Sequence, residues 1–399
     1  MLSNGYLLHR IKNMGNNITT SQNVEYGELI PNDICITWKN VEKQTSLPAR
    51  EGQCCCGHNK TLYIFGGVLQ GHAHGHDTDP QESNDLLAFD TDVNKWEKIN
   101  VTGKIPPPRS TASIVAIGNK LYLFGGLSHL SGWFDVLHEY DIESKKWTEV
   151  SHEGKPPAPR DKLTAVAIGT NIFYFGGFGP KSEEMELDGS EEDEDELPGG
   201  GASFGWFNDM FVYDTVNKKW SQPMQLNLGV PTPRAAHGMC AVGKDLVIFG
   251  GRDTECRRND LHIYDTESRK WKDFKVKGRQ PEPRSFHSTT AVGNKVVVMG
   301  GRGEQNQHYA DLHIFDTETM EWLQPKVSGD LPVGRGQHSV GVVDNQVVLF
   351  GGTSDFRAEI MQCQTFHKDT FVANIDDFLK GQSTKKYKWT GWIVIMILG

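Results

Sequence analysis

The sequence predicts an all-β protein, a six-bladed β-propeller, and two recurring features lead to this prediction. An apolar stretch typical of a β-strand runs into a Gly-Gly pair six times, and a tryptophan stands 28 to 30 residues before each pair. The pairs are Gly66-Gly67, Gly125-Gly126, Gly176-Gly177, Gly250-Gly251, Gly300-Gly301 and Gly351-Gly352. The tryptophans are Trp38, Trp96, Trp147, Trp220, Trp271 and Trp322. A period of about 50 residues that holds four short strands is typical of propeller blades.

One repeat, residues 283–322, shows the four expected strands most clearly. The first strand follows Pro283-Arg284, the second is the β-branched run 295–299, the third covers residues 311–315, and Trp322 opens the fourth. β-Branched and aromatic residues favour strands, and the Gly-Asn and Asp-Thr pairs between these runs favour turns. Because antiparallel strands alternate in direction, the segments after the Gly-Gly pairs and the links after the Trp strands are expected on one face.

The order of the repeats indicates how the ring closes. Trp38 comes before the first Gly-Gly pair, and no Trp strand follows the last pair. Residues 33–43 are therefore expected to supply the outer strand of the sixth blade, which leaves no free sheet edge. A short helix is expected within residues 371–380. The predicted domains are a flexible N-terminal tail over residues 1–32, the propeller over residues 33–372 with an acidic loop insertion over residues 181–199, and a C-terminal tail of unassigned role over residues 373–399.

Composition favours an intracellular protein of the cytoplasm, the nucleus or both. The chain of 399 residues has 43 glycines, as a turn-rich all-β protein requires, and seven cysteines at spacings that suggest no disulfide framework. Its net charge of −10 argues against a nucleic-acid surface, and no signal-peptide core is found near the start. The apolar run 392–398 is too short to span a bilayer. We expect that the protein uses no cofactor, binds no nucleic acid and does not associate firmly with membranes.

Two segments that follow Gly-Gly pairs stand out by composition. Residues 183–196 read EEMELDGSEEDEDE, within a connection about twenty residues longer than in the other blades. This segment is either a solvated loop or a gate that repels acidic partners or recruits basic ones. Residues 71–76 read GHAHGH, and alternating histidines are able to hold a metal ion. Because a glycine-rich loop does not preorganise its side chains, no metal site is predicted there.

Residues that break the repeat are better candidates for function than residues that recur. The recurring residues, which are expected to be structural, are Arg50, Arg109, Arg160, Arg234, Arg284, Arg335, His237, His287 and His338. The departures on the predicted ligand face are Lys162, Arg252, Arg257, Ser285 and Phe286, with Phe178 and Trp206 at the two ends of the acidic connection. Arginine binds a carboxylate bidentately and aromatic rings exclude water around it, so this set suits a peptide that ends in a free carboxylate. Alternatively, Arg252 and Arg257 pair with neighbouring acids.

The repeats also resemble a known family. Gly-Gly, a Tyr or Phe shortly before Asp, and Trp form the kelch pattern over roughly residues 33–372. PPAPRDKL, GWFNDMFVYDT, FGGRDTECRRNDLHIYD and PRSFHS resemble the kelch-domain-containing substrate receptors of cullin and elongin ubiquitin ligases, which capture C-terminal diglycine degrons. The resemblance implies that one Lys, two Arg, one Ser and three aromatic residues line the pocket. By motif these are Lys162, Phe178, Trp206, Arg252, Arg257, Ser285 and Phe286.

The resemblance has departures, and they keep a second function open. The family usually has Tyr where this chain has Phe178 and Trp where it has Phe286, and the Leu-x-x-x-Cys start of an elongin-binding helix is not found after Thr353. The implied function is capture of protein C-termini that end in glycine, with elongin and cullin ligase subunits as further partners. The alternative is a kelch-repeat interaction scaffold without ligase coupling, as in vesicle-transport effectors or transcriptional cofactors. No nucleophile, phosphate-loop or paired-carboxylate motif favours an enzyme.

Overall fold

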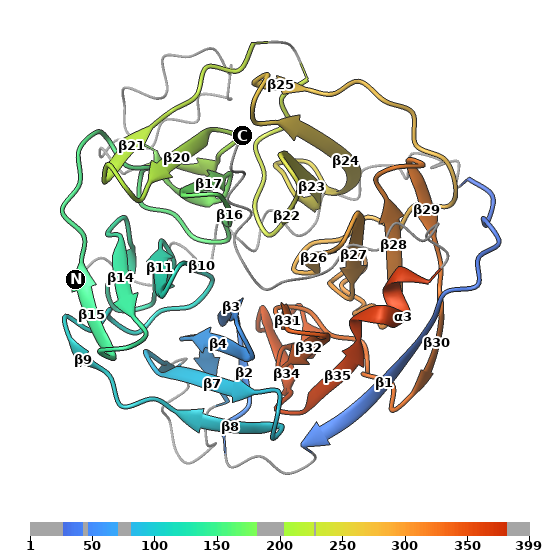
Figure 1. Cartoon of the computed structure of the whole chain (residues 1–399), viewed down its shortest axis with the longest axis horizontal. Coiled ribbons are helices and arrows are strands. Elements are labelled where there is room, and N and C mark those ends of the chain that lie inside the picture. The colour runs from blue at the N-terminus through green and yellow to red at the C-terminus, as the bar shows by residue number, and fades with distance from the viewer. Residues whose placement is uncertain (1–26, 43–46, 71–80, 182–202, 227–228, 381–399) are drawn as a thin grey trace, which may run out of the picture.

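The computed structural model describes residues 27–42, 47–70, 81–181, 203–226 and 229–380. Within them, small antiparallel sheets circle a central axis as six blades (Figure 1). In blades one to five the innermost strand comes first in the chain and the following strands are added outward, whereas blade six takes its outer strand from the N-terminal segment. The predicted six-bladed, all-β propeller is therefore confirmed.

Blades one to three share this order from the inside outward. Blade one consists of β3 (Cys54–His58), β4 (Thr61–Phe65), β7 (Leu86–Asp90) and β8 (Lys95–Lys98). Blade two consists of β10 (Ser113–Ile117), β11 (Lys120–Phe124), β14 (His138–Asp141) and β15 (Lys146–Glu149), with β9 (Thr102–Gly103) parallel outside it. Blade three consists of β16 (Thr164–Ile168), β17 (Asn171–Phe175), β20 (Met210–Asp214) and β21 (Lys219–Ser221).

Blades four to six follow the same plan with two variations. Blade four consists of β22 (Gly238–Val242), β23 (Asp245–Arg252), β24 (Arg257–Asp265) and β25 (Lys270–Trp271). Blade five consists of β26 (Ser288–Val292), β27 (Lys295–Met299), β28 (Leu312–Asp316) and β29 (Glu321–Leu323). Blade six consists of β31 (Ser339–Val343), β32 (Gln346–Phe350), β35 (Thr370–Asn374) and the N-terminal β1 (Cys35–Glu42), with β30 (Lys326–Gly329) outside it.

Short hairpins follow five of the six Gly-Gly pairs and stand at one end of the blades. In blade four the two central strands themselves continue past Gly250-Gly251 and form this hairpin. The remaining short strands are β2 (Arg50–Glu51), β5 (Val68–Leu69), β6 (Gln81–Glu82), β12 (Leu127–Ser128), β13 (Gly132–Trp133), β18 (Phe178–Lys181), β19 (Ser203–Trp206), β33 (Thr353–Arg357) and β34 (Gln362–Phe366). In blade five the segment after Gly300-Gly301 makes only isolated bridges.

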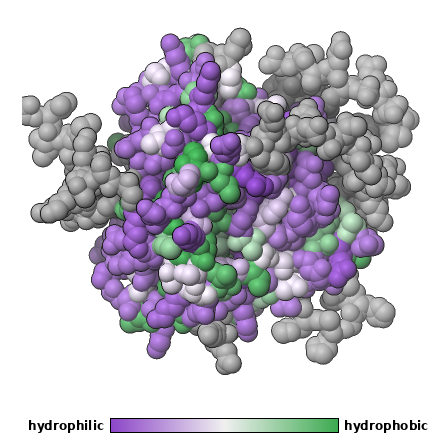
Figure 2. Space-filling model, turned by 90° about the vertical axis from the view of Figure 1, so that its right-hand side faces the viewer, coloured by the Kyte–Doolittle hydropathy of each residue, from purple (hydrophilic) through white to green (hydrophobic). Residues whose placement is uncertain are grey.

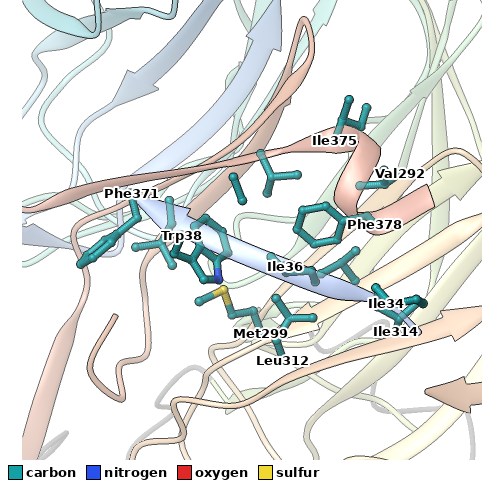
Figure 3. Close-up of a cluster of buried hydrophobic side chains, with 14 of the residues drawn as sticks. Ile34, Ile36, Trp38, Val292, Met299, Leu312, Ile314, Phe371, Ile375 and Phe378 are labelled. Atoms are coloured by element: carbon teal, nitrogen blue, oxygen red, sulfur yellow. The ribbon is translucent and has the colours of Figure 1, made fainter. Parts of the chain in front are cut away.

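Strand β1 closes the ring as predicted, because it is the outer strand of blade six. It pairs antiparallel with β35 and parallel with β30. Its inward side chains Ile36 and Trp38 are 0% and 2% exposed, and Figure 3 shows them packed toward Met299 and Leu312 of blade five. The N-terminal segment therefore contributes core contacts to two blades as well as hydrogen bonds to one sheet.

The C-terminal end of the described chain differs in detail from the sequence expectation. Residues 371–374 belong to β35, and the short helix α3 (Ile375–Leu379) begins only after the N-cap Asn374. Phe378 of α3 is 0% exposed within the same cluster as β1 (Figure 3). The Ile375 N–H donates to the Asn345 carbonyl in the turn between β31 and β32, so α3 lies at the end of the blades away from the hairpins. No helix among the described residues is long and apolar enough to cross a membrane.

The recurring arginines are structural, as expected. Each of the six is 0% or 1% exposed, and its Nη1 atom donates to the carbonyl of the first glycine of the Gly-Gly pair in the same repeat. Both glycines of a pair have positive φ, as at Gly300 (63°) and Gly301 (97°), and a Cβ on Gly301 would lie 2.8 Å from His287 Cβ. The pair is thus required by backbone conformation and by close packing of the preceding link.

Six link residues, one per blade, form a closed ring of backbone hydrogen bonds, which we call the channel mouth. All six have φ between 53° and 65°. Each N–H donates to the carbonyl of the preceding ring member at 2.6–3.0 Å, and Gly52 closes the ring by donating to Gln337. The members are Gly52, Thr111, Lys162, Ala236, Phe286 and Gln337. This ring fixes which side chains surround the end of the channel where the hairpins stand.

Candidate functional site

The channel mouth and the hairpins around it bring the predicted site residues to one end of the propeller. A cavity of about 120 Å³ lies at the mouth and is lined by all six ring members, including Lys162 and Phe286. Beneath them it is lined by the next residue of each link, among them His237, His287 and His338. Burial, followed by the charge of the neighbouring arginine, lowers the pKa of these three histidines to about 3, so they are neutral at physiological pH.

Blade four positions the two predicted arginines opposite each other. The ladder of β23 and β24 continues past the Gly-Gly pair, so that Arg252 is the cross-strand partner of Arg257. Arg257 is 7% exposed, and its Nε atom donates to the Oγ of Ser285 at 3.0 Å. Its Nη atoms donate to the Glu304 carbonyl at 3.4 Å and to Asn306 Oδ1 at 3.2 Å. Three of the predicted residues therefore meet where blades four and five adjoin.

Neither of these arginines has a carboxylate partner among the described residues. The acids of this hairpin, Asp253 and Glu255, are instead bound by the adjacent Arg258. The interpretation that Arg252 and Arg257 pair with neighbouring acids is therefore wrong for the described part of the chain. Burial, followed by the charges of Arg302 and Arg252, lowers the pKa of Arg257 to about 9. A buried guanidinium that bonds only neutral oxygens is an unsatisfied site for an anion.

Blade three contributes a second group that consists of Lys162, Phe178 and Trp206. Phe178 and Trp206 face each other across the β18–β19 hairpin, with ring centroids 4.9 Å apart. Lys162 Nζ lies 5.9 Å from the Phe178 ring centroid and donates to Asp161 Oδ2 at 2.5 Å. Asp161 is 0% exposed and also accepts bonds from Thr111 Oγ1 and Trp133 Nε1. Unlike Arg257, the ammonium of Lys162 already has a counter-ion.

The predicted residues thus fall into two groups joined by the ring. The backbone of Ala236 connects them, because its N–H donates to Lys162 and its carbonyl accepts from Phe286. Phe286 lines the cavity beside a residue that the sequence analysis missed, Arg302, whose Cζ lies 5.3 Å from the Phe286 ring centroid. Arg302 follows Gly300-Gly301 as Arg252 follows Gly250-Gly251, so an alignment of the repeats against each other would have identified it.

Glu51 is a carboxylate at this end of the propeller that was not among the predicted site residues either. Glu51 accepts hydrogen bonds from Gln337 Nε2 at 2.6 Å and from the Thr353 hydroxyl. Burial raises the pKa of its carboxyl group, although the Thr353 bond and the charge of Arg302 oppose this. Glu51 makes no ion pair within 4.0 Å among the described residues, so it does not neutralise the arginine cluster by direct contact.

Other features of the described chain give little support to a catalytic or metal-binding function. Burial raises the pKa of the Cys54, Cys55 and Cys56 thiols, which is unsuited to a nucleophile. No group of three or more metal-ligating side chains is found among the described residues. The histidine-rich segment 71–76 and the acidic run 183–196 lie outside them.

A second cavity, of about 370 Å³, lies on the rim of blade five and not at the mouth. Its lining includes Leu29, Leu312 and Val327. Its charged side chains are already paired, Asp311 with Arg284 and Arg279 with Glu282. Figure 2 shows the rim on the right-hand side of Figure 1, where hydrophilic residues predominate at the edges and hydrophobic residues gather toward the middle. Nothing in this lining selects a ligand charge, so the mouth is the stronger candidate site.

The blades, the Gly-Gly pairs and the ring at the mouth define a kelch-repeat β-propeller. The model of the "KLHDC2/KLHL20/DRC7 Kelch-repeats domain" matches residues 71–224 and 197–352, and the chain belongs to this family. It is 31% identical over 324 residues to Kelch domain-containing protein 1 of Mus musculus, which covers 77% of this chain and 76% of that protein.

Other similarities agree with the fold. The chain is 29% identical over 243 residues to Kelch domain-containing protein 2 of Bos taurus, which covers 60% of this chain and 59% of that protein's length. It is 27% identical over 253 residues to Acyl-CoA-binding domain-containing protein 4 of Arabidopsis thaliana, covering 61% of this chain and 34% of that protein. The solved structure titled "Structure of YjhT" aligns with a TM-score of 0.59 at 15% identity, covering 82% of this chain and 95% of that one.

Proposed function

We propose that this protein is a non-enzymatic receptor for protein C-termini that end in glycine, and that it serves as the substrate-recognition subunit of a cullin-RING ubiquitin ligase. The observation that carries the first half is the unpaired arginine pair of blade four. Arg257 is buried with only neutral hydrogen-bond partners, and Arg252 lies directly across the hairpin from it. A peptide α-carboxylate supplies the missing negative charge, and its two oxygens suit two guanidinium groups.

The surrounding groups favour a small terminal residue. Ser285 is 0% exposed and holds Arg257 Nε at 3.0 Å, so the guanidinium is oriented before a ligand arrives. Phe178, Trp206 and Phe286 supply aromatic walls on the neighbouring blades. Lys162 adds a donor at the mouth, held by Asp161. An aromatic enclosure around the carboxylate disfavours side chains on the last residues, which selects Gly-Gly by shape as well as by charge.

The carboxylate clamp is tested with one peptide in two forms. We expect a peptide ending in Gly-Gly to bind the wild-type protein much more tightly than its C-terminally amidated twin in a calorimetric titration. Truncating Arg252 or Arg257 to alanine should cost on the order of 2 to 5 kcal/mol of binding free energy, as for one partner of a buried charge pair. The Arg252→Ala, Arg257→Ala double variant should bind acid and amide alike.

A matched control removes the same charge from the same blade at the opposite end. Arg269 is exposed in the turn between β24 and β25, so Arg269→Ala should leave both affinities unchanged. Equal wild-type affinity for acid and amide, or full affinity in the double variant, would reject the clamp. The protein would then be better described as a kelch-repeat interaction scaffold.

The ligase half of the proposal rests on the family resemblance and needs its own measurement. Purified chain is mixed with purified elongin and cullin subunits and passed over a size-exclusion column. Co-elution supports a substrate receptor of such a ligase. Separate elution, together with intact binding of the Gly-Gly peptide, would leave a C-terminus-binding protein that acts without this ligase.

A further inference from the structure

A third arginine, Arg302 of blade five, extends the positive charge at the mouth beyond the clamp. Its backbone is fixed against the link into the same blade, because Ser285 N–H donates to its carbonyl at 3.0 Å and its N–H donates to the Ser285 carbonyl at 2.8 Å. The residue that anchors Arg257 through its hydroxyl thus anchors Arg302 through its backbone. The two side chains approach the mouth from adjacent blades.

Two aromatic rings hold the Arg302 guanidinium in place. Its Cζ atom lies 4.2 Å from the Phe356 ring centroid in β33 and 5.3 Å from the Phe286 ring centroid. Stacking on rings occupies the faces of a guanidinium and leaves its edge, where the N–H groups point, available for hydrogen bonds. The Nε atom is buried and has no hydrogen-bond partner among the described residues.

No described carboxylate neutralises Arg302 by direct contact. Glu51, whose charge acts on Arg302, accepts the Gln337 and Thr353 hydrogen bonds at its Oε2 atom and forms no ion pair within 4.0 Å among the described residues. Burial is the main cause that lowers the pKa of Arg302, and the charge of Arg252 lowers it further, whereas Cys363 and the charge of Glu51 oppose the shift. Placing a third like charge here is unfavourable unless a ligand offsets it.

One α-carboxylate does not account for all three arginines. It has two oxygens, and the cross-strand pair Arg252 and Arg257 is sufficient to bind both. A neutral main-chain carbonyl would satisfy the edge of Arg302 but not its partly buried charge. The flat fork of a guanidinium packed against aromatic rings is matched by a second carboxylate.

We propose that Arg302 binds the carboxylate of an acidic side chain, Asp or Glu, that lies within the few residues preceding the C-terminal Gly-Gly of the captured peptide. This inference rests on the proposed function, because it takes the α-carboxylate to occupy the clamp of blade four. It narrows the ligand class from C-termini that end in glycine to acidic C-termini that end in glycine, read between blades four, five and six.

The test uses a panel of synthetic peptides that share a Ser/Ala background and end in Gly-Gly. One Asp is placed at each of the positions before Gly-Gly in turn, each with an Asn twin and a C-terminally amidated twin. For wild-type protein we expect one position at which Asp binds at least about tenfold tighter than Asn, as for one charge-assisted hydrogen-bonded pair. Arg302→Gln should abolish this Asp-over-Asn preference and leave the affinity of the Asn twin unchanged.

Two further variants serve as controls for the effect of Arg302→Gln. Arg302→Lys keeps the charge and should keep part of the preference, which separates loss of charge from loss of fold. Arg357→Gln removes an exposed arginine, paired with Asp355 at 3.2 Å, from the same region and should leave the preference intact. Thermal melting of each variant verifies that the propeller is folded.

The outcomes separate this inference from the proposed function. If no position prefers Asp in wild-type protein, or if Arg302→Gln weakens Asp and Asn twins equally, the acidic subsite is rejected. The clamp survives either result as long as acid termini still bind better than amidated termini. If the amidated twins bind as tightly as the acids, the proposed function itself has failed.

Discussion

The Gly52 N–H donates to the carbonyl oxygen of Gln337 at 3.0 Å and thereby joins the first blade to the sixth at the channel mouth. At the outer edge of the same seam, β1 completes blade six. The innermost strands also approach closely here, since a Cβ on Gly57 would lie 2.2 Å from the Val342 carbonyl oxygen. The ring is therefore closed at its inner strands, its mouth and its outer edge by residues far apart in sequence.

The substitution Trp38→Ala measures how much the outer strand β1 contributes to the stability of the propeller. Trp38 is 2% exposed in the cluster that joins blades five and six, so the substitution removes a large buried side chain. We expect the free energy of unfolding to fall by about 3 to 5 kcal/mol in urea titrations. Lys39→Ala, on the exposed side of the same strand, is the control and should change stability by less than about 0.5 kcal/mol. Equal effects of the two substitutions would contradict a structural role for the buried face of β1.

The acidic insertion should be dispensable for folding. Its ends are held side by side by the β18–β19 hairpin, where Lys181 pairs with Ser203 and Phe178 pairs with Trp206. The cost of closing a loop depends only weakly on its length, so replacing residues 183–199 by a short Gly-Ser linker should change stability by about 1 kcal/mol or less. Circular dichroism melting compares the two proteins. A large loss of cooperative melting would show that the segment packs on the propeller.

The sequence predicted the fold because its repeating residues report repeating physical requirements. Each Gly-Gly pair needs positive φ, and each buried arginine satisfies the carbonyl of the first glycine. Closure by residues 33–43 followed from the missing last Trp strand, and the pairing of β1 with β35 confirms it. The boundary at residue 373 was less predictable. Phe378 of α3 joins the core, but α3 is not part of a repeat, so no recurring sequence pattern indicates these contacts.

The site was less predictable than the fold, because its interactions cross between blades. Arg302 occupies the same repeat position as Arg252, so an alignment of the repeats identifies it, but its packing beside Phe286 and Phe356 appears only in the structure. The bond between Lys162 and Asp161 was also hidden. Adjacent residues on a strand point to opposite faces, but Lys162 has φ of 53°, which lets its side chain turn back to its neighbour. The binding of a peptide by the seven predicted residues stays a prediction.

Stability should decrease in mild acid because of the neutral histidines beneath the mouth. Burial, followed by Arg284, lowers the pKa of His287 to about 3, below the value of about 6.5 in the unfolded chain. Between these values the unfolded state binds more protons, so the free energy of unfolding falls as pH falls from about 6.5 toward 3. A single such histidine contributes a slope of up to about 1.4 kcal/mol per pH unit.

His287→Gln isolates this contribution, and blade one supplies the precedent. There Gln53 occupies the equivalent position, and its Nε2 donates to the Phe350 carbonyl at 3.2 Å, as His287 Nε2 bonds the Phe249 carbonyl at 3.1 Å. We expect the variant to fold normally at pH 7.5 and to show a shallower loss of stability between pH 6 and pH 4. Unfolding titrations at several pH values measure the slope. An unchanged slope would mean that His287 is not the source of the acid sensitivity.

Lys162 should contribute to peptide affinity mainly by masking Asp161. The two form a contact of 2.5 Å, and Asp161 is 0% exposed with Thr111 and Trp133 as its other donors. Replacing Lys162 by Met leaves the buried carboxylate without its counter-ion at the mouth, where it repels the carboxylate of a ligand. We expect the affinity for a peptide ending in Gly-Gly to fall by roughly tenfold, equivalent to about 1.4 kcal/mol of binding free energy.

The double variant Lys162→Met, Asp161→Asn decides between masking and direct contact. If Lys162 acts through Asp161, removing the acid as well should restore most of the affinity, and the two substitutions will be strongly non-additive. If Lys162 Nζ itself binds the ligand carboxylate, the double variant should stay as weak as Lys162→Met. Arg257→Ala provides the contrast, because Arg257 bonds only neutral groups and no second substitution among its described partners should rescue it. Isothermal titration of the wild type, Lys162→Met, Asp161→Asn and the double variant against the acid and amidated peptides gives the coupling energy directly.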